Sequence, residues 1–190
     1  MSMQLISNAV TAGILAGGAG RRMGGADKGW VQWHGRAMVM HVATALRPQC
    51  SRLLISANRN LQAYESVGDR VLRDAESGFN GPLAGVLSLL KACTQRYLLL
   101  APVDAVRLPL DLLDRLAAPG AAIAVASLAG RLHYPCCLID RVRVRAPDNA
   151  EGSMRDWMRG QDMQPVDMPP DAILSLNTLA ELADTPRSVA

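Results

Sequence analysis

Short apolar runs alternate along the chain with longer segments whose apolar residues recur at helical spacing. The runs that end in turn-forming residues predict β-strands at 11–16, 53–57, 70–73, 97–102 and 121–127. Helices are predicted at 37–46, 82–93 and 110–117. Because strands and helices follow one another in turn, the sequence predicts an α/β fold with a mostly parallel sheet and helices on both faces.

The run at 97–102 is the most continuously apolar of the predicted strands, so we expect it at the centre of the sheet. The first strand, at 11–16, is followed directly by a glycine-rich stretch, which is therefore expected at the carboxyl edge of the sheet. Trp30 and Trp33, which come before the first long helix, are predicted to pack in the core rather than to contact a ligand.

Length and composition set the size of the domain. The chain has 190 residues, of which 49% are apolar, and this is enough for one domain with a full core. We expect a single domain over 1–190, with 1–10 as a loose N-terminal extension. The net charge of +3 is a small difference between 20 basic and 17 acidic side chains, so it indicates neither a nucleic-acid partner nor a membrane partner.

The N-terminal apolar run at 9–16 is shorter than a membrane span and has no signal-peptide features, so we expect a cytoplasmic protein. The four cysteines have no Cys-x-x-Cys spacing, which indicates neither a zinc site nor a redox pair. They are predicted to be buried reduced thiols, at Cys50, Cys93, Cys136 and Cys137.

The stretch at 15–29 carries the candidate chemistry. Six of its fifteen residues are glycine, and it also contains the three cations Arg21, Arg22 and Lys28. Glycines let backbone N–H groups approach a ligand closely, and the cations add full charge, so the stretch is typical of a polyphosphate site. A flexible surface turn is the alternative, but ordinary connections between a strand and a helix are shorter, roughly 2–6 residues.

Two familiar phosphate loops do not match this stretch. A P-loop needs Gly-Lys followed by Ser or Thr, whereas Lys28 stands between Asp27 and Gly29. The dinucleotide pattern Gly-x-Gly-x-x-Gly fails as well, because its third glycine falls on Arg22 or Met23.

The stretch instead resembles the signature Leu-Ala-Gly-Gly-x-x-x-Arg-Met-Gly-x-x-Lys of nucleotidyltransferases with a Rossmann-like fold, and in particular the molybdenum cofactor guanylyltransferases. Relatives that use CTP tend to carry Ala-Ala-Gly where this chain has Ala16-Gly17-Gly18. The resemblance implies a single-domain nucleotidyltransferase fold, in which about 11–104 handle GTP and Mg²⁺ and about 105–190 handle the pterin substrate.

Polar residues follow three of the predicted strands, at Asn58, Asp74 and Asp104. In an open parallel sheet such positions meet at the ligand crevice, although Asn and Asp are also frequent turn residues. A carboxylate facing a polyphosphate loop is suited to Mg²⁺, which makes Asp104 the candidate metal ligand. The resemblance implies a nucleotide site made of Leu15, Ala16, Gly17, Gly18, Lys28, Asn58, Asp74 and Asp104.

The second half of the chain is similar to the family at three further points. His133 lies where the family has a His-Pro pair, and Gly152 to Met158 begins a predicted helix that resembles a Gly-x-Arg segment. The tail at 173–182 matches a strand, an Asn-Thr pair and a last helix. The resemblance implies that His133, Arg155 and Asn177 bind the pterin substrate. Three alternating arginines favour a solvated face over an anion patch, at Arg141, Arg143 and Arg145.

The resemblance implies that GMP is transferred from GTP to the phosphate of Mo-molybdopterin, with Arg22, Lys28 and Asp104 as the catalytic residues. Product would then pass to molybdoenzymes or their chaperones. Two alternatives stay open from the residues alone: another nucleotidyl transfer, from CTP to the same acceptor or to a sugar phosphate, and a nucleotide-binding regulator without turnover. A pure binder has no need of a metal carboxylate beside leaving-group cations, which weighs against the regulator.

Overall fold

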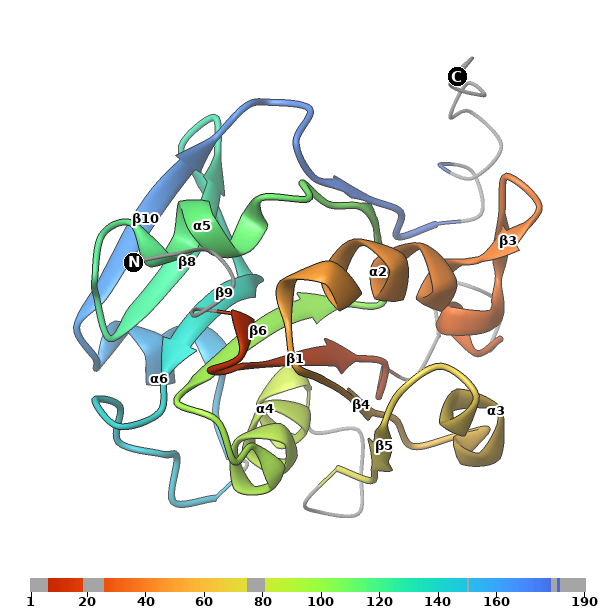
Figure 1. The fold of residues 1–190 in the computed structure, drawn as a ribbon, viewed down its shortest axis with the longest axis horizontal. Helices are drawn as coiled ribbons and strands as arrows, with labels where there is room; N and C mark the ends of the chain where they lie inside the picture. The colour runs from red at the N-terminus through yellow and green to blue at the C-terminus, as the bar shows by residue number, and fades with distance from the viewer. Residues whose placement is uncertain (1–6, 19–25, 75–80, 150, 179–180, 182–190) are drawn as a thin grey trace.

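The computed structural model describes residues 7–18, 26–74, 81–149, 151–178 and 181, and a seven-stranded sheet runs through the middle of the molecule (Figure 1). The strand order is β10-β8-β9-β6-β1-β4-β5. These strands are β1 (Val10–Leu15), β4 (Arg52–Ser56), β5 (Arg70–Leu72), β6 (Tyr97–Pro102), β8 (Ile123–Leu128), β9 (Arg131–Asp140) and β10 (Met163–Met168). In this sheet β9 alone runs antiparallel to its neighbours, so the predicted mostly parallel α/β fold is confirmed.

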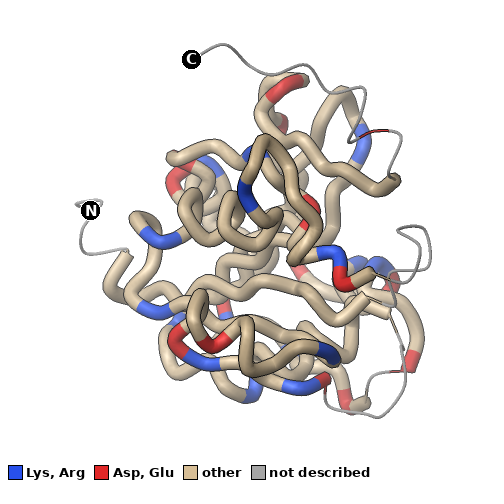
Figure 2. The backbone as a smooth tube through the Cα atoms, turned by 90° about the vertical axis from the view of Figure 1, so that its right-hand side faces the viewer, with Lys and Arg blue, Asp and Glu red and all other residues tan. Residues whose placement is uncertain are grey.

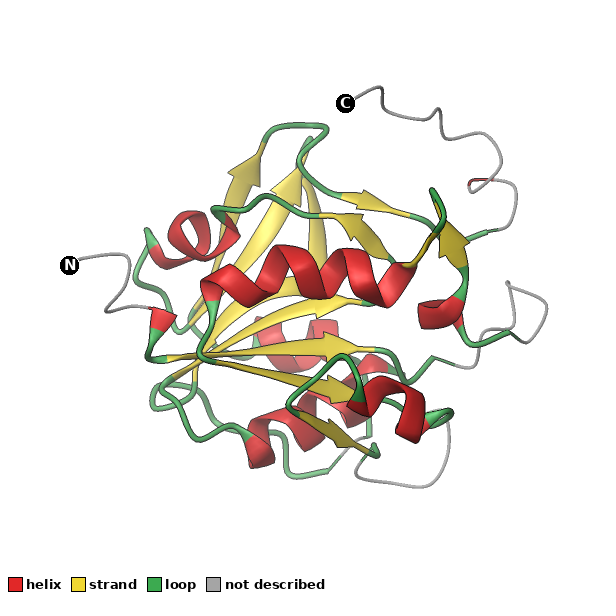
Figure 3. Cartoon of the chain, turned by 45° about the vertical axis from the view of Figure 1, so that its right-hand side comes forward, coloured by secondary structure: helices red, strands yellow, loops and turns green. Residues whose placement is uncertain are grey.

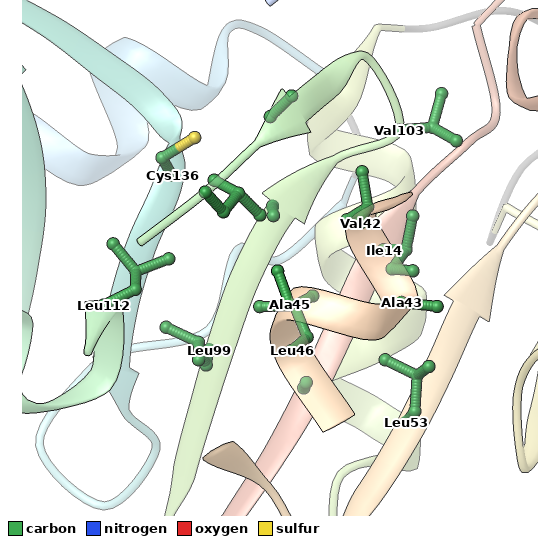
Figure 4. Packing of buried hydrophobic residues seen from close by; sticks show 14 of the residues in the cluster. Ile14, Val42, Ala43, Ala45, Leu46, Leu53, Leu99, Val103, Leu112 and Cys136 are labelled. Carbon is green, nitrogen blue, oxygen red and sulfur yellow. The ribbon is translucent and has the colours of Figure 1, made fainter. Parts of the chain in front are cut away.

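Helices cover both faces of the sheet, as Figure 3 shows. Helices α2 (Met38–Leu46) and α5 (Leu112–Ala117) pack on one face, and α4 (Pro82–Ala92) and α6 (Met154–Arg159) pack on the other. Side chains of successive strand residues point to opposite faces, so Leu53 and Ile55 join the first apolar layer while Leu54 joins the second. Figure 4 shows the first layer, in which α2 packs against β1, β4 and β6.

Strand β6 is the fourth of the seven strands, which confirms its predicted central place. All of its residues except the first and the last are buried, because it pairs with β1 on one side and β9 on the other and is covered on both faces. The two tryptophans also pack as predicted. Trp33 is buried in a small cluster with Met38, Val106 and Leu176, and Trp30 packs against the larger core and the Tyr64 ring.

Two short ribbons lie beside the main sheet. One pairs β2 (Gln32–Trp33) with β3 (Arg36–Ala37), and the other pairs β7 (Ala105–Arg107) with β11 (Leu174–Ser175). The second ribbon returns the end of the chain to the carboxyl edge of β6, because β7 starts three residues after that strand. The connections also contain the 3-10 helices Lys28–Trp30 and Arg47–Gln49 and the short helix α3 (Leu61–Glu65).

Strands β9 and β10 were not predicted from the hydrophobic pattern. The first residues of β9 are only partly buried and include Pro135, so they lack the apolar run of a central strand. Strand β10 is an edge strand, which explains how it accommodates Pro165 and several exposed polar residues. An edge strand needs few apolar residues and only on one face, so its sequence shows a weak hydrophobic pattern.

The four cysteines are free thiols, as predicted, and all but the half-buried Cys50 are buried. Burial raises the pKa of the Cys136 thiol to about 12, and burial likewise raises that of Cys137. Neither thiol is therefore reactive near neutral pH. Among the described helices, none combines the length and the apolar composition needed to span a membrane.

Candidate functional site

The carboxyl ends of four neighbouring strands bring the predicted residues to one edge of the sheet. Gly17 and Gly18 follow β1, Asn58 follows β4, Asp74 follows β5 and Asp104 follows β6. Figure 2 turns this edge toward the viewer and shows basic and acidic residues interspersed over it. The site is therefore built by topology from segments that lie far apart in the sequence.

Lys28 and Asp104 form an ion pair at this edge. The Lys28 Nζ atom lies 2.5 Å from Oδ2 of Asp104, and 19% of the lysine side chain and 17% of the aspartate side chain are exposed. Such a pair is shielded enough for its charges to interact strongly and open enough for a ligand to reach them. Lys28 also donates to Oδ1 of Asn177 at 3.1 Å.

The tail strand explains how Asn177 reaches this pair. Ser175 pairs with Ala105 across the β7–β11 ribbon, and the Leu176 N–H donates to the carbonyl of Asp104 at 3.1 Å. The Thr178 hydroxyl accepts from the Glu181 N–H, and a Glu181 carboxylate oxygen accepts from the Asn177 N–H. These two bonds resemble a capping box, except that the glutamate accepts from the N–H of the residue before the threonine.

A second group of polar side chains lies around Asp74. Asn58 Nδ2 donates to Oδ2 of Asp74 at 2.6 Å and to the Gly17 carbonyl at 3.1 Å, and Asn58 Oδ1 accepts from the Asp74 N–H at 3.2 Å. The buried Ser56 hydroxyl donates to Oδ1 of Asp74 at 2.5 Å. Asn58 thus joins the ends of β1, β4 and β5 into one hydrogen-bonded unit.

Gly17 must be glycine for this unit to form. A Cβ atom at residue 17 would lie 2.6 Å from Oδ2 of Asp74 and 3.1 Å from Nδ2 of Asn58, well inside ordinary contact. At the neighbouring Gly18, none of the described residues outside its chain neighbours has an atom within 4 Å of the corresponding position. The close approach of the two side chains therefore requires a glycine at residue 17.

Leu15 and Ala16 hold the base of the glycine-rich stretch in place. Leu15 ends β1, and its carbonyl accepts from the Val103 N–H at 3.0 Å, one residue before Asp104. The Ala16 N–H donates to the Ser56 carbonyl at 2.7 Å. Arg22, the other predicted catalytic cation of this stretch, lies outside the described residues.

His133 lies on β9 within electrostatic reach of Asp104. Burial lowers the pKa of its imidazole, the Arg131 charge lowers it further, and Asp104 opposes both effects. The imidazole is therefore mainly neutral at pH 7 and can donate or accept a hydrogen bond. The Arg155 guanidinium lies 5.9 Å from the centre of the neighbouring Tyr134 ring, and within the described part of the chain no bond joins it to Lys28 or Asp104.

The alternating arginines at 141–145 lie at the opposite end of the sheet. Strand β9 is antiparallel to β6, so its last residue, Asp140, pairs with the first residue of β6, Tyr97. Arg143 pairs with Asp162 at 2.7 Å and Arg145 with Asp148 at 3.4 Å, both on the surface. This arrangement agrees with the solvated face and not with a patch for the substrate at the carboxyl edge.

Asp104 fits the kind of site in which Mg²⁺ is held. Within the described residues no group of three or more His, Cys, Asp or Glu side chains could enclose a metal ion. Mg²⁺ keeps several waters and is usually bound by one or two carboxylates together with substrate phosphates. The Asp104 carboxylate, whose side chain is 17% exposed, is an oxygen donor of the kind that such a site needs.

Sequence reasoning missed five residues that support the site: Ser56, Asp27, Arg59, Asn60 and Tyr64. Ser56 is the last residue of β4 and Arg59 comes three residues later, so their position at the carboxyl edge could be inferred from the strand prediction. Tyr64 lies in α3, which was not predicted, and its hydroxyl donates to Oδ1 of Asp27 at 2.6 Å. A contact of this kind between distant polar side chains has no signal in the sequence.

Comparison with known proteins identifies the family of this chain. The family model of the MobA-like NTP transferase domain matches residues 12–172. The molybdenum cofactor guanylyltransferase of Shewanella putrefaciens (strain CN-32) is 38% identical over 185 residues, which is 90% of this chain and 93% of that protein. The protein of the same name from Ralstonia nicotianae is 47% identical over 129 residues, 68% of this chain and 61% of that one.

Solved structures share the fold. The molybdopterin-guanine dinucleotide biosynthesis protein A of Archaeoglobus fulgidus has a TM-score of 0.69 at 17% identity and covers 91% of this chain and 95% of its own. The 2-C-methyl-D-erythritol 4-phosphate cytidylyltransferase of Thermus thermophilus has a TM-score of 0.65 at 15% identity, with 90% and 94% covered. Since proteins named for guanosine and cytidine nucleotides share it, the fold alone does not select the base.

Proposed function

Because this chain belongs to the family of MobA-like NTP transferase domains, we propose that it transfers GMP from GTP to the phosphate of Mo-molybdopterin and releases pyrophosphate. The choice of GTP and of the pterin acceptor is supported by the names of the relatives that cover most of the chain. The structural observation that carries the chemistry is the convergence of Lys28, Asp104 and Asn177 beside the glycine-rich stretch.

The reaction needs no nucleophilic side chain. The acceptor is a phosphate monoester with a second pKa near 6, so its oxygen is ionised at pH 7 and needs no general base. That oxygen forms a bond to the α-phosphorus of GTP, and the bond from this phosphorus to the β-phosphate oxygen breaks. The electron pair leaves with pyrophosphate, so the protein must align the two substrates and neutralise the departing charge.

Lys28 is the described residue best suited to neutralise that charge. Its ammonium group is held at the end of the glycine-rich stretch by two oxygen acceptors, one after β6 and one after β11, so it is oriented before substrate binds. We assign Arg22 a parallel role on the basis of its place in the same stretch. The backbone of Leu15 to Gly18, with Asn58 and Asp74, is proposed to bind the nucleoside part of GTP.

Asp104 is proposed to hold Mg²⁺ together with the phosphates of GTP. When bound, the ion supplies Lewis-acid stabilisation of negative charge on the reacting phosphates. The ion pair with Lys28 keeps the Asp104 carboxylate at the mouth of β6, where an oxygen ligand for the metal is needed.

The pterin substrate is proposed to bind on the side of the site formed by 105–190, with 11–104 serving GTP. Asn177 and His133 offer amide and imidazole groups near Asp104, and Arg155 offers a guanidinium near β9. A guanidinium can make a bidentate contact with a phosphate, which suits the acceptor. We propose that the product passes to molybdoenzymes or their chaperones, and the four free thiols support a reducing, cytoplasmic setting.

A substrate panel tests this function. The purified chain is mixed with molybdopterin, Mg²⁺ and either GTP, CTP, ATP or UTP, and pyrophosphate release is measured. We expect GTP to have the highest kcat/KM, and Lys28→Ala to lower that value by about 10²-fold or more. The matched control is Lys91→Ala, since Lys91 is exposed in the last turn of α4. Faster turnover of CTP than of GTP would contradict the guanylyl assignment.

A further inference from the structure

The segment that follows β4 holds both ends of the glycine-rich stretch. Arg59 Nη2 donates to the carbonyls of Gly18 and Ala26, at 3.3 Å each, so one side chain contacts the stretch on both sides. Asn60 Nδ2 donates to Oδ2 of Asp27 at 3.0 Å. The segment from Asn58 to Tyr64 thus provides four side chains to this stretch, those of Asn58, Arg59, Asn60 and Tyr64.

Asp27 connects these contacts to Lys28, the next residue in the chain. Its carboxylate accepts from the Tyr64 hydroxyl at 2.6 Å, from Asn60, and from the Gly29 N–H at 3.2 Å. The last of these bonds caps the 3-10 helix Lys28–Trp30, in which Lys28 is the first residue. The direction of the Lys28 side chain is therefore set by a turn that Asp27 closes.

Tyr64 is fixed as the donor in this group. Its ring is fully buried and packs against Trp30, with ring centres 5.3 Å apart. Burial raises the pKa of its hydroxyl, and the Asp27 carboxylate raises it further, so the hydroxyl stays protonated. A Cβ atom at Gly29 would lie 2.2 Å from this hydroxyl, so the turn after Lys28 lies directly on Tyr64.

A lysine side chain has four rotatable bonds and loses considerable rotamer freedom when its ammonium group is held in one place. Lys28 reaches Asp104 and Asn177 together only if its backbone is held still. We propose that Asp27 and Tyr64 are positioning residues that act on nucleotide binding through Lys28. Neither side chain touches the substrate; each fixes the turn from which the ammonium group extends.

This inference rests on the proposed function, and a double-mutant cycle tests it. The affinity for GTP is measured by calorimetry for wild type, Tyr64→Phe, Lys28→Ala and the double variant. Phenylalanine keeps the buried ring and removes only the hydroxyl. We expect Tyr64→Phe to weaken GTP binding by roughly tenfold in the wild-type background, the loss typical of one hydrogen bond to a charged group, and by less than about twofold when Lys28 is absent.

Asp27 variants provide a second measurement that a merely structural role would not reproduce. Asp27→Asn retains an acceptor for Gly29 and Tyr64 and is expected to keep GTP affinity within roughly threefold of wild type, whereas Asp27→Ala loses about as much as Lys28→Ala. Tyr97→Phe is the matched control for Tyr64→Phe, because Tyr97 begins β6 at the far end of the sheet. Thermal unfolding of every variant separates loss of fold from loss of positioning.

Equal losses from Tyr64→Phe in the two backgrounds, or no loss in either, would overturn the positioning role. Failure of the proposed function looks different, because wild type would then prefer another nucleotide in the substrate panel. The cycle measured with that nucleotide still tests whether Tyr64 acts through Lys28.

Discussion

Replacement of Gly17 by alanine tests whether the group around Asp74 binds the nucleotide. The added methyl would lie 2.6 Å from Oδ2 of Asp74, against an ordinary contact distance of at least 3.4 Å, so the carboxylate must move by several tenths of an ångström. Two short hydrogen bonds hold that carboxylate in place. It is bonded to Ser56 at 2.5 Å and to Asn58 at 2.6 Å, and any shift lengthens or bends one of these bonds.

The size of the effect follows from those bonds. A hydrogen bond to a charged group contributes about 1.5–3 kcal/mol, and Asp74 is partly exposed, so we take the lower end for the weakened bond. A loss of about 1.5 kcal/mol corresponds to roughly a tenfold weaker affinity. We therefore expect Gly17→Ala to lower the free energy of unfolding by about 1.5 kcal/mol. Because Asp74 must return to its place to bind the nucleotide, we also expect the Kd for GTP to rise by up to about tenfold.

Gly160→Ala is the matched control, because Gly160 lies at the end of α6 with an ordinary backbone angle and its methyl would come no closer than 3.4 Å to the Trp157 carbonyl oxygen. Both variants are titrated with GTP by calorimetry in the presence of Mg²⁺, and urea unfolding reports their stability. If Gly17→Ala bound GTP as tightly as Gly160→Ala does, the reasoning that places Asp74 and Asn58 in the nucleotide site would be refuted.

Three further outcomes are expected. Asp104→Ala should abolish turnover with Mg²⁺ while circular dichroism shows an intact fold, and a folded, fully active variant would exclude the metal role. Arg155→Ala should raise KM for molybdopterin and leave GTP affinity nearly unchanged, unlike Lys28→Ala; comparable losses of GTP affinity would contradict the two-sided site. Burial raises the pKa of Asp140, but hydrogen bonds and nearby positive charge, led by the hydrogen bond from Arg96, together outweigh burial and lower this pKa overall. The ionised Asp140 carboxylate therefore stabilises the fold above the unfolded pKa near 4, and this stabilisation is lost as the pH falls through the lower folded pKa. Asp140→Asn should reduce the loss of stability at acid pH, as measured by urea unfolding.

The sequence predicts the central part of the fold well because that part is dominated by burial. Strand β6 has an apolar residue at nearly every position, and the glycine-rich stretch begins directly where β1 ends. Burial on both faces leaves no freedom in such strands, so the hydrophobic pattern and the observed structure coincide. Edge strand β10 escapes prediction for the opposite reason, since its exposed residues tolerate Pro165 and polar side chains.

Some residues of the candidate site are placed by the order of the strands and others by short local pairings, and only the former could be predicted from the residues alone. Asn58, Asp74 and Asp104 could be predicted because each lies two residues beyond the end of a strand, and the carboxyl ends of parallel strands meet. Asn177 could be proposed only from the resemblance, because its position depends on the β7–β11 ribbon, which has two paired residues on its shorter side. A ribbon this short has too few residues to show a recognisable alternation of apolar and polar positions in the sequence.

The support for Lys28 marks the limit of what the sequence can predict. Asp27 and Tyr64 are separated by 37 residues, and their bond depends on the unpredicted helix α3 and on a buried ring. Yet the chemical requirement for such support could be stated in advance, because a flexible ammonium group binds a phosphate tightly only when its freedom is already restricted. The hydrophobic pattern thus identifies which strands deliver reacting groups to the edge of the sheet, and the structure identifies the neighbouring segment, from Asn58 to Tyr64, that holds one of those groups in place.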